Sequence, residues 1–460
     1  MDASNLFARN FLDVRYEDLS KEVVDITKSE ILDTLGVTAA GLGQAAAKQV
    51  LEMARDWGGT PQSSIIGTRL KVPAPNAAQV NASMAHARDY DDVHEAAVMH
   101  PGVIAIPVAL AIGELVGGMT GKEFITAVAL GADMICRLGL ASRPGVSPIH
   151  TGWHYTTLYG YPTAALTAGK ILGLDEEQMI AAFGIAYHQC SGNSQCVTDG
   201  TLTKRLGPGF AVRGGVTAAL LAQRGVTGAR NSLEGKNGLF NQYHFGEYDR
   251  NILIQDLGRH FEGINVSLKP YPCCRGVHVS IDAALALSAK YNIDAAGIKE
   301  ISIITGAANH QLLCTPFEAK IKPRNPVDAQ FSIPWGVATA LLRRRVGMED
   351  YSAAAVADPE LLRLAAKITA TVDPALSSPM GIEPVLLTVV MDNGESFHQR
   401  VDLPKGTPGQ PISIADSVGK FADCVSFIGM GGDKVRQSID MVDRLENLED
   451  VRKLIQLFTC

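Results

Sequence analysis

The sequence has few of the features that mark several common protein classes. Aromatic residues make up only 6% of the 460 residues, and no cluster of Lys and Arg is interleaved with them. The cysteines contain no Cys-x-x-Cys pair and no iron–sulfur spacing, so neither a disulfide framework nor a cluster is expected. A reducing compartment fits them best. The eight cysteines are Cys136, Cys190, Cys196, Cys273, Cys274, Cys314, Cys424 and Cys460.

Positive charge is also scarce. The formal net charge is −7 and the isoelectric point is near 5.9, so the molecule has no overall field that would attract nucleic acid or anionic lipid. Nucleic acid is therefore excluded as an expected partner. An anionic substrate would need a local basic pocket instead.

Long hydrophobic runs and a leader segment are missing as well. The apolar stretch 103–116 is interrupted by Pro107 and Glu114, and it falls short of the ~20 residues that a spanning helix needs. The opening segment 1–6 lacks a basic region followed by an apolar one. We therefore expect a cytoplasmic protein with no membrane segment.

The composition that is present indicates a globular, mainly helical protein of two or three domains. Hydrophobic residues make up 46% and charged residues 19% of the chain. Glycine and alanine are abundant, which favours helices that pack closely through small side chains. Helical periodicity predicts that the first 260 residues are nearly all helix. The expected helices are 19–42, 76–88, 104–115, 121–140, 162–172, 175–189 and 210–224, with capping boxes at Thr120/Glu123 and Asp175/Gln178.

The pattern changes after Lys269. A helix over 276–289 precedes four strand-like runs, of which the last two flank the hairpin signal Asp392-Asn393-Gly394. A Pro/Gly-rich connector at 404–411 leads back to helical periodicity over 412–458. These patterns predict a discontinuous all-helical domain, 1–265 and 404–460, and a smaller α+β domain, 266–403. The expected strands are 299–305, 368–372, 385–391 and 396–403.

Four segments could carry chemistry, and the first is 86–101. It places Asp89, Asp91, Asp92, His94, Glu95 and His100 where a helix gives way to a break at Pro101. Crowded carboxylates and imidazoles perturb one another's pKa and can serve as acid and base. A solvated loop with Asp helix caps is the alternative for any single acid. The other alternative is that these residues bind a divalent metal. No His-x-x-x-His or Glu-x-x-His pair supports a metal site, so we predict no metal.

The second and third segments add an imidazole and two cations. His154 lies just before a helix of small residues. A single histidine in such a position is more often a core residue whose hydrogen bonds are satisfied. Lys204 and Arg205 directly precede a Gly-rich helix, where side-chain cations and free N–H groups together suit a carboxylate. An exposed basic turn is the alternative. No strand precedes these glycines, so they are not a dinucleotide fingerprint.

The fourth segment is 268–282. Prolines predict an extended entry that carries Lys269 and Arg275, followed by a helix. His278 and Asp282 are one helical turn apart, so the carboxylate could orient the imidazole. The alternative is a purely structural hydrogen bond. Cys273 and Cys274 lack an evident base and are expected to be buried small hydrophobes.

In this order and spacing, the four segments resemble the MmgE/PrpD family, as do 170–175 and 328–334. The resemblance covers about 20–420. It implies a mainly α fold, with a large all-helical domain and a smaller α+β lid domain, usually homodimeric, and an active site in the cleft between the domains. It also implies chemistry on a small anionic di- or tricarboxylate without metal or organic cofactor. The active-site residues implied by motif position are Asp89, Asp92, His100, His154, Lys204, Lys269 and His278.

Some positions depart from the family pattern. Val93-His94 replace the Thr or Cys and Trp of several relatives, Gly102 stands where Ser often follows His-Pro, and Trp335 stands where the decarboxylases have Tyr. These residues shape substrate choice. Family membership therefore does not transfer a substrate.

The resulting hypothesis is a lyase that removes a proton or CO₂ beside a carboxylate, in the manner of 2-methylcitrate dehydratase. The alternatives are a decarboxylase, an epimerase using the same site, and a non-catalytic helical scaffold. Lys204 and Lys269, with Arg205 and Arg275, are expected to bind carboxylates and stabilise the intermediate. His154 and His278 are the candidate general base and acid. Asp89 and Asp92 would orient His100 or bind a water.

Overall fold

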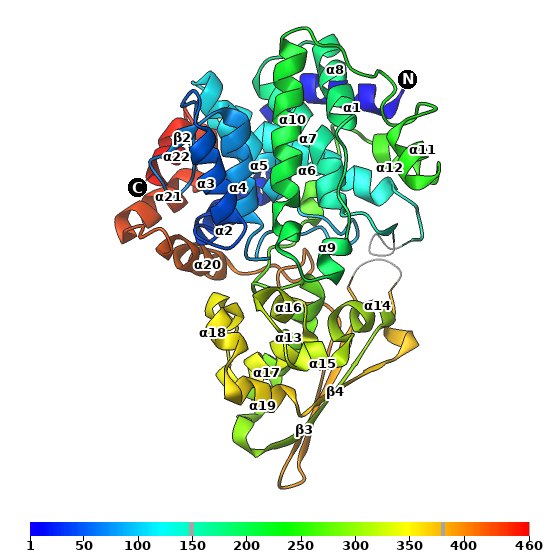
Figure 1. Ribbon diagram of the computed structural model, residues 1–460, viewed down its shortest axis with the longest axis vertical. Helices are drawn as coiled ribbons and strands as arrows, with labels where there is room; N and C mark the ends of the chain where they lie inside the picture. The colour runs from blue at the N-terminus through cyan, green and yellow to red at the C-terminus, as the bar shows by residue number, and fades with distance from the viewer. Residues whose placement is uncertain (147–150, 379–381, 460) are drawn as a thin grey trace. The chain divides into compact units, whose positions relative to one another are not determined.

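The computed structural model describes residues 1–146, 151–378 and 382–459. By their internal contacts these form two compact units, Met1–Val266 with Ser413–Cys460, and Ser267–Ile412. We call them the helical unit and the mixed unit, and each is described by itself (Figure 1).

The helical unit is built of helices around one apolar core, and α7 and α10 lie side by side in it (Figure 1). Its helices are α1 (Ala3–Asp13), α2 (Lys21–Ala40), α3 (Ala47–Trp57), α4 (Ala74–Ala85), α5 (Gly102–Val116), α6 (Gly121–Ala141), α7 (Tyr155–Ile171), α8 (Glu176–Tyr187), α9 (Gln195–Thr198), α10 (Gly207–Gln223), α11 (Leu239–His244), α12 (Arg250–Ile254), α20 (Ile414–Ser426), α21 (Gly432–Asp443) and α22 (Arg452–Leu457). A two-stranded ribbon joins β1 (Ser63–Ser64) and β2 (Lys71–Val72).

The seven helices predicted from periodicity in this part of the chain are present, and both capping boxes are formed. One start was wrong. Helix α7 begins at Tyr155 and contains Pro162 inside it, whereas the sequence placed the start at Pro162. Proline favours the first turn of a helix, but the aromatic and hydroxyl residues before it are buried here and extend the helix towards His154.

Helix α6 corrects the expectation about hydrophobic runs. By length and composition it could cross a membrane, with a mean hydropathy of 1.6 in its most apolar window, and that window is 94% buried inside the protein. Packing in the core accounts for its apolar character. A capping box lies at the N-terminus of this helix, and the buried Arg137–Asp133 ion pair lies within it.

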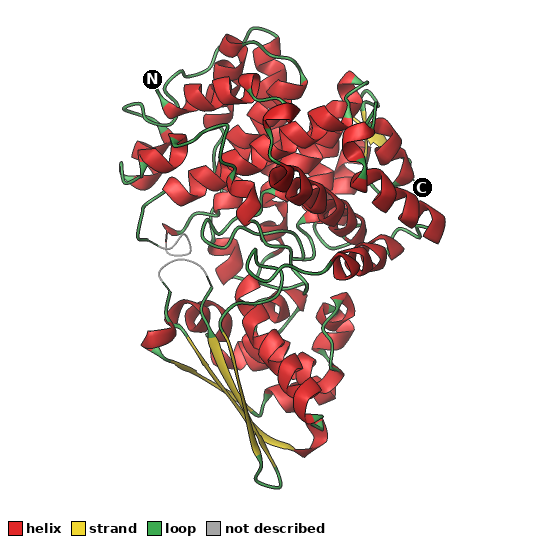
Figure 2. Ribbon diagram, turned by 180° about the vertical axis from the view of Figure 1, so that it is seen from behind, coloured by secondary structure: helices red, strands yellow, loops and turns green. Residues whose placement is uncertain are grey.

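The mixed unit is a four-stranded sheet with helices. Its strand order is β4-β3-β5-β6, with β3 and β4 parallel and the other pairs antiparallel. Figure 2 shows the strands beside the helices of this unit. The elements are α13 (Arg275–Tyr291), β3 (Ile298–Thr305), α14 (Ala307–Asn309), α15 (Phe317–Ile321), α16 (Pro326–Gln330), α17 (Ile333–Arg343), α18 (Ala353–Val356), α19 (Pro359–Ala365), β4 (Ile368–Val372), β5 (Val385–Met391) and β6 (Ser396–Val401).

One face of this sheet is buried. In register, Ile301 pairs with Val389 and Ile303 with Leu387, and all four side chains are almost fully buried. Helix α13 contacts β5 and β6. The period-2 pattern read from the sequence therefore marks the face that packs on helices.

The predicted hairpin between β5 and β6 is confirmed, but its turn differs from the two-residue Asn-Gly type. Met391 N–H donates to Glu395 O at 2.8 Å, and Gly394 N–H donates to Met391 O at 3.0 Å. Gly394 has a φ of +86°, and Asn393 is not among the described residues with positive φ. Glycine alone therefore supplies the left-handed conformation of this longer loop.

Candidate active site

The predicted site residues divide between the two units. Asp89, Asp92, His100, His154, Lys204 and Arg205 belong to the helical unit, and Lys269, Arg275 and His278 belong to the mixed unit.

The acid-rich segment of the helical unit is a buried loop between α4 and α5. His86 caps the C-terminus of α4. A short bridge between His94 and Met99 then folds the chain back, with His94 N–H donating to Met99 O at 2.8 Å, just before His100. Asp89 adopts a left-handed φ of +52°, a conformation that Asp tolerates better than most residues and that often accompanies functional loops.

Asp91 joins two imidazoles in this loop. Its Oδ2 lies 2.7 Å from Nδ1 of His86 and 3.1 Å from Nδ1 of His100. Asp91 and His86 are completely buried, whereas the His100 side chain is 13% exposed. We call these three residues the His–Asp cluster. Of its members, only His100 has a surface open to a small molecule.

Hydrogen-bond partners determine which nitrogen carries the proton in this cluster. Nδ1 of His100 also lies 2.6 Å from the backbone O of Asp92, and a carbonyl can only accept. Burial would raise the pKa of Asp91, but the adjacent His86 and His100 hold it well below its usual 3.8, so this carboxylate also accepts. Both Nδ1 atoms therefore donate. The Nε2 atoms face away from these acceptors.

The roles predicted for the acids need correction. The carboxylate beside His100 is that of Asp91, which the motif contained but to which no role was assigned, while Asp92 contacts the ring through its backbone oxygen. The Asp92 carboxylate accepts the N–H of Gly102 at 2.9 Å, where it caps the start of α5. His86 was also missed. A signal for both was available, since they lie in the same dense motif.

Asp89 is paired with Lys204 instead. Nζ of Lys204 lies 2.9 Å from Oδ1 of Asp89, and both side chains are over nine-tenths buried. Lys204 and Arg205 lie in the 3₁₀ turn Leu202–Leu206 that runs into α10, as the sequence predicted for a position before a helix start. Burial lowers the pKa of Arg205, and Asp89 opposes that shift. Two buried cations therefore stand near one carboxylate.

His154 caps the N-terminus of α7. Its Nδ1 lies 2.7 Å from Oγ1 of Thr157, and its ring centroid is 6.0 Å from that of His86. Desolvation, followed by Lys204, lowers the pKa of His154 well below 6.5. The positive end of the helix dipole acts in the same direction. His154 is therefore a neutral imidazole near pH 7, beside the His–Asp cluster.

The His–Asp cluster is also the one group of metal-ligand type found among the described residues, since one donor atom of each lies within 4.8 Å of the others. Two imidazoles and a carboxylate could hold a divalent transition metal. The distances to Asp91 are equally those of hydrogen bonds. The cluster therefore fits a metal by residue type, while its contacts are explained by hydrogen bonding.

In the mixed unit, the segment before α13 is held by backbone bonds. Leu268 N–H donates to Gly406 O at 3.0 Å, and Cys274 N–H donates to Gln330 O at 2.9 Å. Lys269 lies in this segment and is only 1% exposed. Cys273 is fully buried, as expected of a small hydrophobe. A lysine is thus held rigidly inside the unit.

His278 does not pair with Asp282, which corrects the expectation from their spacing. Its Nδ1 accepts from Nη1 of Arg275 at 3.0 Å, and its Nε2 donates to Cys273 O at 3.2 Å. Arg275 also donates to Lys405 O at 2.7 Å. With both nitrogens engaged and no exposed surface, His278 orients Arg275 in this geometry. An acid or base role for His278 finds no support here.

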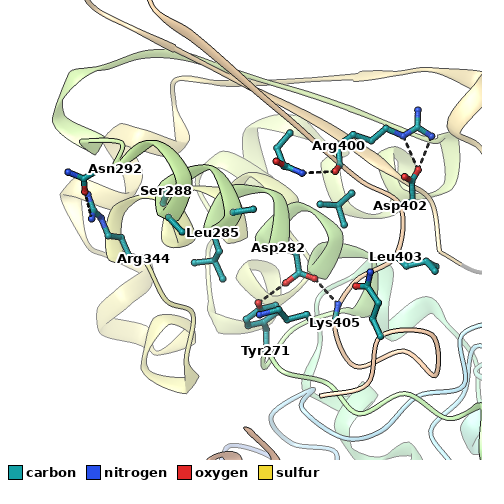
Figure 3. Close-up of a pocket in the computed structure, with 15 residues that line it drawn as sticks. Tyr271, Asp282, Leu285, Ser288, Asn292, Arg344, Arg400, Asp402, Leu403 and Lys405 are labelled. Atoms are coloured by element: carbon teal, nitrogen blue, oxygen red, sulfur yellow. Dashed lines mark hydrogen bonds and ion pairs between the residues drawn. The ribbon is translucent and has the colours of Figure 1, made fainter. Parts of the chain in front are cut away.

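Asp282 has different partners and lies beside a pocket. It accepts from the hydroxyl of Tyr271 at 2.7 Å and from Lys405 N–H at 2.8 Å, at the edge of a pocket of about 840 Å³ within the mixed unit (Figure 3). None of Lys269, Arg275 and His278 lines this pocket. Of its three cations, Arg344 and Arg400 are bonded to Asn292 and Asp402, and Lys405 is exposed. The pocket is therefore separate from the predicted chemistry.

Comparison with known proteins identifies the class. Residues 5–251 match the MmgE/PrpD N-terminal domain, and residues 271–447 match the MmgE/PrpD C-terminal domain. The chain belongs to the MmgE/PrpD family and is an enzyme of the lyase kind that this family contains. The resemblance read from the motifs is confirmed, and so is the mainly α fold with a smaller α+β part.

Several characterised relatives are similar to the chain along most of its length. Cis-aconitate decarboxylase of Aspergillus terreus is 24% identical, over 96% of this chain and 93% of that protein. Cis-aconitate decarboxylase of Homo sapiens is 25% identical, over 98% and 93%. 2-Methylcitrate dehydratase of Cupriavidus necator is 25% identical, over 79% and 76%.

Proposed function

We propose that this chain is a cofactor-independent lyase that acts on a small di- or tricarboxylate by building negative charge on the carbon next to a carboxylate. The observation that carries the proposal is the set of groups in the helical unit: a buried Lys204 beside two imidazoles in contrasting environments. Charge that develops on a substrate carboxylate is stabilised most strongly by fixed cations where water is excluded.

The two imidazoles suit opposite roles. His154 is neutral near pH 7 because burial and nearby cations disfavour its charged form, so it can accept a proton. His100 faces the Asp91 carboxylate, which stabilises an imidazolium that can donate one. Groups whose environments separate their proton affinities in this way commonly divide the acid and base work.

Two reactions are consistent with this assignment. In a dehydration, His154 takes the C–H proton, the electron pair is held on the adjacent carboxylate, and hydroxide leaves as water with a proton from His100. In a decarboxylation, CO₂ leaves, its bonding electrons remain on carbon, and His100 protonates that carbon. The base and acid pair favours the first, and the end-to-end similarity to cis-aconitate decarboxylases favours the second.

Lys204 and Arg205 would bind substrate carboxylates in both reactions, and Lys269 and Arg275 are proposed to serve the same substrate. Asp89 would then hold Lys204 in place until substrate arrives. We further propose that the working form is a homodimer, which light scattering of the purified protein would test.

The proposal is tested by incubating the protein separately with 2-methylcitrate, cis-aconitate and iminodisuccinate and following each by NMR. Loss of water from the first or of CO₂ from the second would support a lyase and identify its reaction. Interconversion of the iminodisuccinate enantiomers alone would support an epimerase instead. No conversion of any polycarboxylate would contradict the proposal.

A further inference from the structure

Within the His–Asp cluster, the reaction scheme leaves two buried titratable residues without a role, His86 and Asp91. Both side chains are completely buried, so neither can touch a substrate. Asp91 reaches the chemistry through His100, which shares the Asp91 Oδ2 with His86 and retains some exposed surface, and the centroid of the His86 ring also lies 6.0 Å from that of His154. This contrast in exposure decides which member of the cluster acts and which members position it.

We infer that Asp91 and His86 form a buried positioning pair that sets the proton affinity of His100. Asp91 stabilises the protonated ring of His100, and His86 limits that effect by donating to the same oxygen. The catalytic role of His100 in this inference rests on the proposed function, whereas the contacts among His86, Asp91 and His100 do not depend on it.

The carboxylate acts by orientation and by charge. Asp91 Oδ2 and the backbone O of Asp92 both accept from Nδ1 of His100, so the Nδ1 proton is fixed and Nε2 is the atom that exchanges a proton. A buried carboxylate that holds an imidazole in one tautomer and stabilises its cation is a known aid to catalysis.

His86 moderates that carboxylate. Its Nδ1 is 0.4 Å closer to Asp91 Oδ2 than that of His100, the two distances being 2.7 and 3.1 Å. Burial lowers the pKa of His86 to about 4, so it donates one hydrogen bond as a neutral ring across the working pH range. A hydrogen bond to the charged form of an acid disperses its charge, and less of that charge is left for His100.

Among the described residues, several groups face His100 from three parts of the helical unit. They are Asp91 and Asp92 O from the same loop, His86 at the end of α4, and Thr156 on α7, whose Oγ1 accepts from the backbone N–H of His100 at 3.1 Å. The ring centroids of His86 and His100 are 4.9 Å apart. Lys204 and His154 interact electrostatically with the same cluster.

The inference predicts opposite effects for two substitutions. In Asp91→Asn the counter-charge is lost, so the limb of the pH–rate profile that reports loss of the donated proton moves to lower pH by roughly one unit, and kcat falls roughly 10²–10⁴-fold. In His86→Phe, Asp91 no longer accepts a hydrogen bond from His86, so more of its negative charge acts on His100. The same limb therefore moves to higher pH.

His244→Phe is the matched control. Burial lowers the pKa of His244 to about 4 as well, and its side chain is also fully buried, but its Nε2 lies 2.7 Å from the Tyr159 hydroxyl instead of a carboxylate. Its replacement should lower the melting temperature and leave the limb in place. A purely structural role for His86 and Asp91 would give this same result for their variants, and that outcome would overturn the inference.

An NMR titration separates this inference from the proposed function. Protein labelled with ¹⁵N-histidine, with His100 assigned by the His100→Gln variant, reports the protonation of that ring without any substrate. Opposite displacements of its titration in Asp91→Asn and His86→Phe support the inference even if no polycarboxylate reacts. Equal or absent displacements in folded variants would refute it even if the enzyme is active.

Discussion

Nζ of Lys204 lies 2.9 Å from Oδ1 of Asp89, a residue 115 positions earlier in the chain, and both side chains are over nine-tenths buried. An ion pair held out of water keeps its charges only because each compensates the other. In the proposed reaction, Lys204 would exchange Asp89 for a substrate carboxylate as its partner. Variants of this pair can therefore separate the effect of Lys204 on stability from its effect on catalysis.

Lys204→Met should abolish turnover and also destabilise the protein by about 3–5 kcal/mol, because it removes one member of a buried ion pair. The double variant Asp89→Asn/Lys204→Met should recover much of the stability but none of the activity. Urea denaturation and initial rates measure the two effects. Wild-type turnover in the double variant would remove Lys204 from the mechanism.

Lys269 offers a parallel test in the mixed unit. Lys269→Met keeps the length of a side chain that is only 1% exposed, so the fold should persist. Turnover with a polycarboxylate should fall to background, because the cation proposed to bind the substrate is gone. Lys405→Met is the control, since the Lys405 side chain is exposed in the same unit. Equal activity of the two variants would refute a role for Lys269.

Stability should fall as the pH is lowered from 6.5 to about 4. Burial lowers the pKa of His86 and of His244 to about 4 in the folded protein, whereas the unfolded chain binds these protons near 6.5. In that window the unfolded state holds more protons, so the free energy of unfolding decreases by up to about 1.4 kcal/mol per pH unit for each such histidine.

Denaturant titrations at intervals across this range, with His244→Phe beside the wild type, measure that slope. The variant should lose one histidine's share of it. A free energy of unfolding that stays level between pH 6.5 and 4 would show that these rings are not buried as neutral groups.

Gly207 is predicted to control the position of His154. A Cβ at this position would lie 2.2 Å from Oγ1 of Thr157, so Gly207→Ala must displace the hydroxyl that lies 2.7 Å from Nδ1 of His154. We expect kcat to fall at least tenfold, because a misplaced base loses most of its contribution. Gly419→Ala in α20 meets nothing within 4 Å and should leave the rate unchanged. Similar rates for both variants would contradict this placement.

Local sequence signals were sufficient for most of the fold. Capping residues at Thr120 and Asp175, period-2 runs on either side of Gly394, and apolar stripes in the long helices each report on a few neighbouring residues. Pro162 misled because the preference of proline for the first turn is weaker than the burial of the residues before it. Tertiary packing decided that boundary.

The site was harder to predict because its contacts join distant segments. The motifs supplied the correct residue types, but the partner of Lys204 and the choice of Asp91 over Asp92 beside His100 depend on how a buried loop turns back through a residue of positive φ. The helical spacing of His278 and Asp282 suggested a pair, yet Arg275 and Tyr271 offer each of them a better partner. Helical spacing shows only that two side chains are close together. Which hydrogen bond forms depends on the other groups within reach.

The central claim, that charge develops on the carbon beside a carboxylate without help from a metal, is tested most directly by deuterium incorporation. Protein dialysed exhaustively against a chelator is incubated in D₂O with cis-aconitate or 2-methylcitrate, and ¹H NMR follows that carbon in residual substrate and product. With the wild type we expect deuterium on the carbon that CO₂ leaves from cis-aconitate, or loss of the C–H signal of 2-methylcitrate as that carbon enters the double bond, and neither change with Asp89→Asn/Lys204→Met. A decarboxylated product without deuterium on the carbon that CO₂ left, a dehydrated product that keeps the hydrogen on that carbon, or activity that returns only when a divalent metal is added, would contradict the account.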